Sequence, residues 1–205
     1  LLSSSGDVRV IMVDRRSKPG GHWNDAYCFV TLHQPALYYG VNSEPLGSGG
    51  GDLVSKSQIL GYYERVLAKH IAGGRLSFYP SCNYVGDGLF ESLVTDGLQY
   101  QVTVTKRVVD STYSDITVPS STPPDYKVSD GVALVPINGL ASLRRAWNGY
   151  VVIGAGKTGM DAALYLLERG VEPERITWIV PNDAWLFDRA RLMPGKLADS
   201  MPSQL

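Results

Sequence analysis

The spacing of apolar residues predicts alternating strands and helices from the start of the chain. Residues 8–13 (VRVIMV) are apolar almost throughout, which is typical of a strand buried on both faces of a parallel sheet. Gly73-Gly74 ends a helix that begins near Ser55, and residues 75–79 form a short strand before Pro80. The helix is indicated by residues at helical intervals: Ile59, Tyr62, Tyr63, Val66 and His70.

A turn signal farther along the chain predicts an antiparallel hairpin. Thr95-Asp96-Gly97 separates residues 89–94 from residues 100–109. The second arm alternates, so we expect one face to be buried and the other wet: Tyr100, Val102 and Val104 against Gln101, Thr103 and Thr105. Residues 111–130 are rich in Ser, Thr and Pro and are the best candidate for a linker between domains.

The strongest functional signal is a glycine-rich turn between a strand and a helix. Residues 150–153 (YVVI) form a short apolar strand, and Gly154-Ala155-Gly156-Lys157-Thr158-Gly159 follows it directly. Gly170 ends the helix, and residues 176–180 (ITWIV) make a second strand. The helix is indicated by i, i+3, i+4 and i+7 spacing: Met160, Ala163, Leu164 and Leu167. A GxGxxG pattern in this β-turn-α-β context is typical of dinucleotide binding.

Each glycine of this turn has a physical task in such a site. Gly154 permits the tight turn, Gly156 lets the backbone approach a pyrophosphate, and Gly159 lets the helix lie close to the strand. The N-terminus of the helix offers backbone N–H groups and a partial positive charge to the phosphates. The alternative is a turn that serves packing alone, in a sheet that binds nothing.

The choice between NAD and NADP stays open. An acidic residue at the end of the second strand favours the ribose 2′-hydroxyl of NAD, whereas an arginine favours the 2′-phosphate of NADP. Pro181 and Asn182 occupy this point, and Asp183 comes just after it. Arg189 and Arg191 lie farther on.

Composition narrows the classes of function. The 205 residues carry a formal net charge of −1, which gives no electrostatic reason for binding nucleic acid or an anionic membrane. No apolar run is long enough to span a bilayer. Two cysteines make no disulfide framework, and HExxH, CxxC and GxSxG patterns are absent, so we expect no metal site and no hydrolase. A cytoplasmic protein that acts on a small-molecule substrate is the expectation.

The N-terminal region adds a second nucleotide signal. Asp14 closes the first strand, where an acidic side chain can face a ribose, and Gly20-Gly21-His22-Trp23 begins six residues later. With residues 150–180, this arrangement resembles the flavin-containing monooxygenase group of two-dinucleotide-binding flavoproteins. The likeness spans nearly the whole chain. It implies an α/β fold with an incomplete two-unit Rossmann-like, FAD/NAD(P)-binding architecture and a small antiparallel β excursion.

The resemblance also implies cofactors and the residues that would bind them. Asp14 would contact the adenosine ribose of FAD, and Gly20, Gly21 and Trp23 would line the flavin side. The pyrophosphate of NADP would be held by the second turn, through Gly154, Gly156, Lys157, Thr158 and Gly159. Such enzymes reduce the flavin with NADPH and often use O₂ to oxygenate a small organic substrate.

The departures from the family pattern predict a chain that is truncated at both ends. The first strand and first GxGxxG of the FAD unit would lie upstream of Leu1, and the family's FxGxxxHxxx(Y/F) stretch is not recognisable. We expect a partial FAD-binding-like domain over 1–120, a linker over 121–145 and a partial NAD(P)-binding unit over 146–205. The missing strand would leave a sheet edge that a homo-oligomer or a partner chain covers.

Two other functions stay open beside the flavin-dependent oxidoreductase. One is a flavoprotein-derived enzyme without redox chemistry, such as a cyclase or isomerase, with His22, His33 or Asp25 as acid or base. Its small-molecule pocket would be lined by aromatic residues: Trp23, Tyr27, Phe29, Tyr38 and Tyr39. The other is a cofactor-free small-molecule-binding subunit that pairs through its exposed sheet edge.

Overall fold

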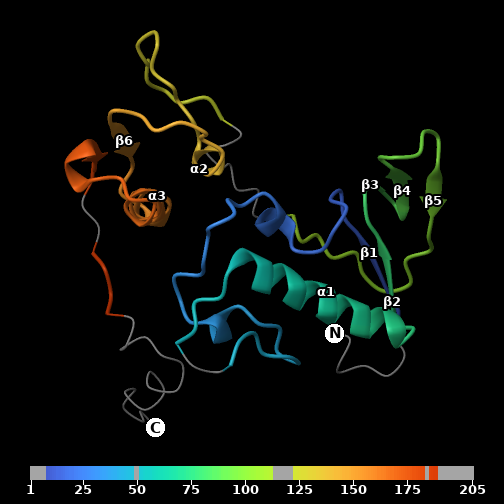
Figure 1. Ribbon diagram of the computed structural model, residues 1–205. Helices are drawn as coiled ribbons and strands as arrows, with labels where there is room; N and C mark the ends of the chain where they lie inside the picture. The colour runs from blue at the N-terminus through green and yellow to red at the C-terminus, as the bar shows by residue number, and fades with distance from the viewer. Residues whose placement is uncertain (1–7, 49–50, 113–121, 183–184, 189–205) are drawn as a thin grey trace. The chain divides into compact units, whose positions relative to one another are not determined.

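The computed structural model describes residues 8–48, 51–112, 122–182 and 185–188 (Figure 1). The chain divides into two compact units. Unit 1 comprises Leu1–Asp25, Val41–Leu46 and Ser57–Asp115, and unit 2 comprises Ala26–Gly40, Gly47–Lys56 and Ile116–Leu205. Both units contain helices and strands, so the chain is of the mixed α/β class. The expected domain bounds of 1–120, 121–145 and 146–205 stay a prediction.

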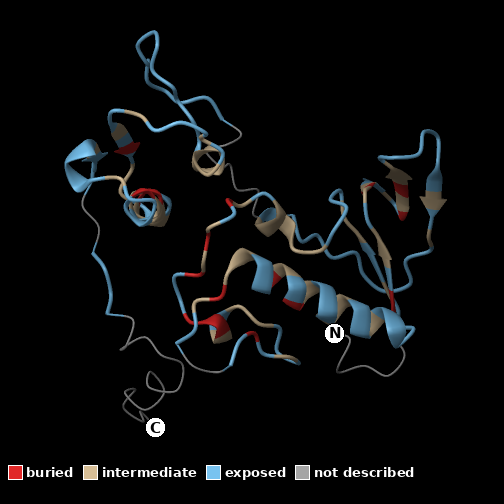
Figure 2. Ribbon diagram, viewed as in Figure 1, coloured by how far each residue is buried: buried red, intermediate tan, exposed pale blue. Residues whose placement is uncertain are grey.

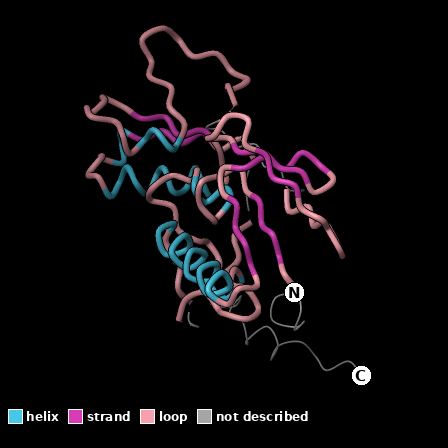
Figure 3. The backbone as a smooth tube through the Cα atoms, turned by 90° about the vertical axis from the view of Figure 1, so that its right-hand side faces the viewer, coloured by secondary structure: helices cyan, strands magenta, loops and turns pink. Residues whose placement is uncertain are grey.

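Unit 1 contains a parallel strand pair that is connected through a helix. Strand β1 (Val10–Val13) pairs with β2 (Leu76–Tyr79) from Val10↔Leu76 to Val13↔Tyr79, and Figure 3 shows the two strands side by side near the N-terminal label. Helix α1 (Lys56–Ala72) lies between them in sequence. Both strands and the helix are confirmed. Ile59 and Tyr62 on the predicted stripe are each 1% exposed, and His70 is half-buried.

The prediction that β1 is buried on both faces is wrong. Ile11 is 43% exposed and Met12 is 41% exposed. A strand is buried on both faces when it has neighbours on both sides and a covering layer on each face. Among the described residues, β1 pairs with β2 alone, so its two central side chains keep contact with solvent.

A short loop is fastened to α1 by one tyrosine and one glutamate. The Tyr62 hydroxyl accepts a hydrogen bond from the Val41 N–H at 2.7 Å and donates one to the Glu44 carbonyl. The Glu44 carboxylate lies 3.1 Å from Arg65 Nε and 3.3 Å from Lys69 Nζ. These two cations hold the pKa of Glu44 below its usual value. The contacts explain why Val41–Leu46 belongs to unit 1.

Unit 1 also contains a three-stranded antiparallel sheet. Its strands are β3 (Cys82–Gly86), β4 (Leu89–Ser92) and β5 (Gln99–Gln101), with β4 in the centre. The predicted hairpin is confirmed by the pairing of β4 with β5. Strand β3 was not predicted, because its sequence is short and does not alternate between apolar and polar residues. The core of the three-stranded sheet is aromatic, since the centre of the Phe90 ring lies 4.8 Å from that of Tyr79 and 5.0 Å from that of Tyr100.

The second hairpin arm is much shorter than residues 100–109. Strand β5 ends at Gln101, and Val104, predicted to be buried, is 44% exposed. The cause lies on the partner strand. The chain turns at Asp87-Gly88, where both residues have positive φ, so a longer arm would find no partner strand before Gly88. The backbone pairing of the second arm ends with the hydrogen bond from the Val102 N–H to the Gly88 carbonyl, at 3.0 Å.

Unit 2 contains a second parallel pair connected through a helix. Strand β6 (Tyr150–Ile153) pairs with β7 (Ile176–Ile179), and α3 (Lys157–Glu168) lies between them, which confirms the predicted strand–turn–helix–strand order. Val152, Ala162 and Leu166 form the core, and α2 (Ile137–Leu140) packs against it. Gly170 ends α3 as predicted. With φ of +79°, it donates to Leu167 O at 2.9 Å while Val171 donates to Leu166 O at 3.1 Å, which is a Schellman motif.

The buried side of α3 differs from the residues whose spacing predicted the helix. Leu164 is 56% exposed and Leu167 is 42% exposed. The buried residues of α3 are Gly159, Ala162 and Leu166. Helical spacing fixes the period of a helix, but which face is covered depends on the residues that it meets.

The segment between β1 and α1 contains little regular secondary structure in its described residues. It contains two 3₁₀ turns, η1 (Gly21–Asn24) and η2 (Ala36–Tyr38), and buries Leu32, Ala36 and Val54 in unit 2 (Figure 2). A third 3₁₀ turn, η3 (Pro173–Arg175), precedes β7. Of the predicted linker 111–130, residues 113–121 lie outside the described residues. None of the described helices is long and apolar enough to cross a membrane.

Candidate functional site

The glycine-rich turn of unit 2 is closed by backbone contacts. Gly154 has φ of +119°, in the region that favours glycine, and its N–H donates to the Ile179 carbonyl at 3.0 Å. The Gly156 carbonyl accepts the N–H of Gly159 at 2.9 Å and that of Met160 at 3.2 Å, which begins α3. The indole N–H of Trp178 on β7 donates to the Gly154 carbonyl at 2.8 Å. The turn, which follows β6 directly, is therefore fastened to β7 by one backbone and one side-chain hydrogen bond.

Gly159 is required by the close approach of α3 to this turn. A Cβ atom at Gly159 would overlap the carbonyl oxygen of Gly154 and lie 3.2 Å from its carbonyl carbon. Because these are backbone atoms, they cannot move aside as a side chain can. The structure thus gives Gly154 and Gly159 the steric tasks that the motif predicts.

Gly156 occupies the N-cap of α3 and leaves the space in front of the helix open. Its φ of −75° and ψ of 175° suit any residue, and a Cβ built there would meet no atom within 4 Å. Glycine is therefore not required here by the fold. An exposed glycine at a helix N-terminus fits a phosphate group, which can then approach the backbone N–H groups without hindrance.

Lys157 and Thr158 lie in the first turn of α3 and belong to a polar cluster. The Lys157 ammonium forms an ion pair with Asp161, one helical turn later. The hydroxyl of Tyr27 donates to the same carboxylate oxygen at 2.5 Å, and the Thr158 hydroxyl also bonds to Tyr27. Burial, and then the hydrogen bond to Asp161, raise the pKa of Tyr27 above its ordinary value. The positive charge of Lys157 is thus balanced by Asp161 beside the open N-terminus of α3.

The contact between Tyr27 and Asp161 was missed by sequence reasoning. The two residues are 134 positions apart, and nothing in the sequence pairs them. Only the i, i+4 spacing of Lys157 and Asp161 was a signal, since oppositely charged residues at this spacing meet on a helix. The neighbouring Phe29 ring stacks on Tyr165 of α3 at 4.1 Å. The segment after residue 25 is therefore docked on α3 by both polar and aromatic contacts.

The other aromatic candidates do not join this cluster. Tyr38 is 49% exposed, and the Tyr39 hydroxyl donates to Gln34. His33 is exposed. A hollow of about 420 Å³ lies in unit 1 beside Tyr84, Gln101 and Val108, and no predicted site residue lines it.

Asp14 lies at the end of β1, as predicted, and takes part in a turn. Its Oδ1 accepts the Arg16 N–H at 2.8 Å, and its backbone bonds to Tyr79 and Cys82. A carboxylate has about four acceptor positions, so a ribose hydroxyl could still donate to it. Asp14 is half-buried. It therefore fits the ribose contact that the resemblance implies, although it also has a local structural role.

Gly20, Gly21 and Trp23 form one tight turn. Gly20 has φ of +116° and Gly21 has φ of +53°, and the Trp23 N–H donates to the Gly20 carbonyl at 3.1 Å. A Cβ at Gly20 would overlap Leu60 of α1, whereas one at Gly21 would meet nothing within 4 Å. Trp23 is half-buried and stacks on the exposed His22 at 5.5 Å. The side of Gly21 is thus open to a ligand.

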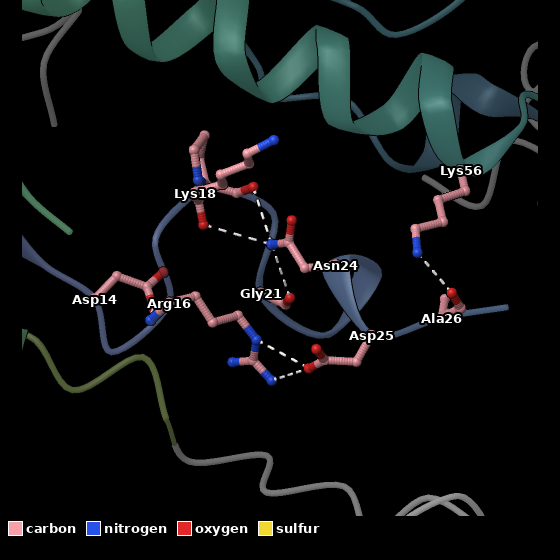
Figure 4. Close-up of polar contacts among 9 residues, drawn as sticks. Asp14, Arg16, Lys18, Gly21, Asn24, Asp25, Ala26 and Lys56 are labelled. Carbon is pink, nitrogen blue, oxygen red and sulfur yellow. Dashed lines mark hydrogen bonds and ion pairs between the residues drawn. The ribbon is translucent and has the colours of Figure 1, made fainter. Parts of the chain in front are cut away.

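Side chains hold this turn from within, as Figure 4 shows. The Asn24 amide donates to the carbonyl oxygens of Pro19 and Gly21 at 3.2 Å each, and to that of Lys18 at 3.4 Å. The Arg16 guanidinium donates to Asp25 Oδ2 through Nε at 3.0 Å and Nη2 at 2.5 Å. Neither Arg16 nor Asn24 was singled out from the sequence, because the glycine pattern does not include them.

The residues that would choose between NAD and NADP are only partly visible. Pro181 and Asn182 follow β7 and are exposed. Asp183, Arg189 and Arg191 lie outside the described residues. Across the described ranges, no group of three or more His, Cys, Asp or Glu side chains could hold a metal ion.

Comparison with known proteins finds relatives of this chain that are described as uncharacterized. No protein-family model matches it. Uncharacterized proteins of Mycobacterium bovis and of two Mycobacterium tuberculosis strains are 47% identical to it over 206 residues. The match covers 95% of this chain and 38% of each relative, so the chain spans less than half the length of the curated relatives that it matches.

Among solved structures, a flavin monooxygenase from Stenotrophomonas maltophilia, solved as a double-substitution variant, has a similar fold. It aligns with a TM-score of 0.54 and 18% identity, over 94% of this chain and 66% of that chain. At this identity the likeness concerns the fold alone. The chain thus has a mixed α/β fold similar to that of this flavin monooxygenase.

Proposed function

We propose that this chain is part of a flavoprotein oxidoreductase that depends on FAD and NAD(P)H, of the monooxygenase type, and that it acts on a small organic substrate. In this proposal the two strand–helix–strand segments are incomplete Rossmann-like units. Unit 2 contributes to the pyridine-nucleotide site and unit 1 to the FAD site. The fold likeness to a flavin monooxygenase supports the class of protein. The expected homo-oligomer or partner chain and the cytoplasmic location remain predictions.

The geometry of the β6–α3 turn is the observation that carries the proposal. Gly154 and Gly159 are needed for the shape of the turn, but Gly156 is not, since a side chain there would meet nothing. A ligand that must approach the backbone gives a physical reason for glycine at such a position. The adjoining helix of 12 residues adds the partial positive charge of its N-terminus.

The residues around each turn would bind and orient the cofactors. The first-turn N–H groups of α3 would donate to a pyrophosphate, and Lys157, balanced by Asp161, would add a cation beside it. Asp14 would accept a hydrogen bond from a ribose hydroxyl. When bound, FAD and NAD(P)H supply the hydride transfer and the oxygen chemistry, while the protein orients them and excludes water.

The first experiment is a titration of the chain with NADPH and NADH, followed by the fluorescence of the reduced nucleotide. Gly156→Val should weaken binding at least about tenfold, because the new side chain fills the approach to the backbone N–H groups and a tenfold change corresponds to about 1.4 kcal/mol. Gly149→Ala is the control. Gly149 lies in the same unit, and a Cβ there makes only an ordinary contact, 3.7 Å from the Arg175 carbonyl.

Equal affinities of Gly156→Val and the parent chain would remove the turn from the nucleotide site. The flavin part is tested by the absorbance spectrum of the chain with added FAD. A protein-perturbed flavin band that is bleached by NADPH supports the redox function. A chain that leaves the spectrum of FAD unchanged contradicts it.

A further inference from the structure

The amide of Asn24 lies at the point where several carbonyl groups of the Gly20–Trp23 turn converge. Its Nδ2 is within 3.4 Å of the carbonyl oxygens of Lys18, Pro19 and Gly21, and Figure 4 shows all three contacts meeting at this nitrogen. An amide nitrogen carries two hydrogen atoms, so three acceptors share two donors. Carbonyl oxygens repel one another at short range, and a shared donor offsets that repulsion.

The turn needs such a donor because several of its carbonyl oxygens converge inside the loop. Gly20 and Gly21 both have positive φ, which leaves the neighbouring carbonyl groups pointing into the loop instead of along a helix or strand. Leu60 of α1 closes the outer side against Gly20. The Asn24 contacts to Pro19 and Gly21 are half-buried, whereas the Arg16–Asp25 pair is largely exposed and contributes less.

We propose that Asn24 is a positioning residue, which holds the Gly20–Trp23 turn in the shape that receives the flavin cofactor. The inference rests on the proposed function. Asn24 need not touch the cofactor: it fixes the carbonyl groups from inside, and the turn then presents the open side of Gly21 and the half-buried Trp23. A preformed turn binds more tightly, because its ordering is complete before the ligand arrives.

Two substitutions distinguish the effect of the amide donor at position 24 from the effect of the shape of the side chain. Asn24→Ala removes the amide, and Asn24→Asp keeps the shape but turns the donor into an acceptor that faces carbonyl oxygens. We expect both to weaken FAD binding about tenfold or more near pH 7.5, with Asn24→Asp the weaker binder of the two. As the pH falls toward about 4, the new carboxyl regains a proton that it can donate, so Asn24→Asp should recover and Asn24→Ala should not.

Other ionisable side chains also lie near the turn. They are Asp14, Arg16, Lys18, His22 and Asp25. All of them are present in the parent chain and in both variants, so only a difference between the pH profiles reports on position 24. Asn83→Ala is the matched control, because Asn83 is an amide of the same unit that bonds to Glu91 at 3.3 Å on the antiparallel sheet. Its affinity for FAD should stay within about twofold of the parent chain.

NADPH binding is measured in parallel on every variant. Each outcome either supports or overturns the positioning role of Asn24. Weaker FAD binding with NADPH binding unchanged, and low-pH recovery of Asn24→Asp alone, supports the positioning role. Parent-like FAD affinity in both variants, or equal losses for FAD and NADPH, overturns the inference and leaves the proposed function standing. A parent chain that binds no FAD overturns the proposed function, and the inference fails with it.

Discussion

Both candidate turns of this protein contain glycines with positive φ, but they are stabilised by different kinds of contact. In the Gly154–Gly159 turn, backbone N–H and carbonyl groups make most of the bonds, and the helix packs directly on the carbonyl of Gly154. In the Gly20–Trp23 turn, the Asn24 amide and the Leu60 side chain surround the two glycines. Apart from the bond from the Trp178 indole, the first turn therefore follows from its glycine spacing, whereas the second depends mainly on side chains outside the motif.

This difference predicts which substitutions each turn should tolerate. A turn that packs backbone against backbone cannot adjust to an added atom without moving a strand or helix. A turn that packs against side chains can adjust, because a rotamer can change at a cost of about 1 kcal/mol. Substitutions at the two turns should therefore differ in size, and those differences can be measured.

The largest effect is expected from Gly159→Ala. The new Cβ would overlap the backbone carbonyl of Gly154, and overpacking of this kind costs about 3 kcal/mol or more when the backbone must move. Alanine gains about 1 kcal/mol over glycine in a helix, which offsets only part of that cost. We expect the free energy of unfolding to fall by about 2 kcal/mol or more, as measured by urea denaturation followed by circular dichroism.

The matched control for this change is Gly61→Ala in α1. Gly61 is also a helical glycine, but a Cβ there would meet nothing within 4 Å, so the chain should become slightly more stable. The same glycine-to-alanine change should thus lower the free energy of unfolding in α3 and raise it in α1. A Gly159→Ala chain as stable as the parent would show that the α3 turn is not closed by backbone contact.

A smaller effect is expected from Gly20→Ala. Its φ of +116° strains any other residue, and the Cβ would overlap the end of the Leu60 side chain. Because Leu60 can rotate, we expect a loss of about 1–2 kcal/mol, mostly from the backbone conformation. Shortening Leu60 in the background of Gly20→Ala separates the two costs. If Leu60→Ala then restores most of the lost stability, the loss came mainly from steric overlap and not from backbone strain.

Sequence reasoning succeeded where the determinants are local. The β6–α3–β7 segment was predicted because strand, turn and helix signals follow one another within about thirty residues and agree. The end of α3 at Gly170 was predicted for the same reason. In the candidate site, the tasks of Gly154 and Gly159 came from one short motif, and the structure gives them the contacts that those tasks require.

It failed where a residue's surroundings come from distant parts of the chain. The apolar run of β1 indicated burial on two faces, but Ile11 and Met12 remain exposed beside a single paired strand. The second hairpin arm was predicted too long, since its length is set by the turn at Asp87-Gly88 on its partner. The pairing of Tyr27 with Asp161 has no sequence signal at all. Local patterns specify elements, whereas tertiary contacts decide which faces are covered.

The smallest effect tests whether the backbone-held turn also depends on a side chain. Tyr27→Phe removes the hydroxyl that donates to Asp161 but leaves the Lys157–Asp161 ion pair, so at pH 8 we expect a loss of about 1 kcal/mol in the free energy of unfolding. Burial and Asp161 raise the pKa of Tyr27 above its ordinary value. Above about pH 10 the unfolded parent chain releases this proton while the folded chain keeps it, so the parent loses stability that the variant never had.

The difference between the two chains should therefore shrink as the pH rises from 8 to about 11, in urea titrations followed by circular dichroism. The pKa values of Tyr39 and Tyr63 are also raised by burial, but both residues are present in each chain, so their contributions cancel in the comparison. A difference that stays constant across this range would mean that Tyr27 ionises equally well in the folded and unfolded chains. In that case the hydroxyl would not be fixed on Asp161, and the Gly154–Gly159 turn would be closed without it.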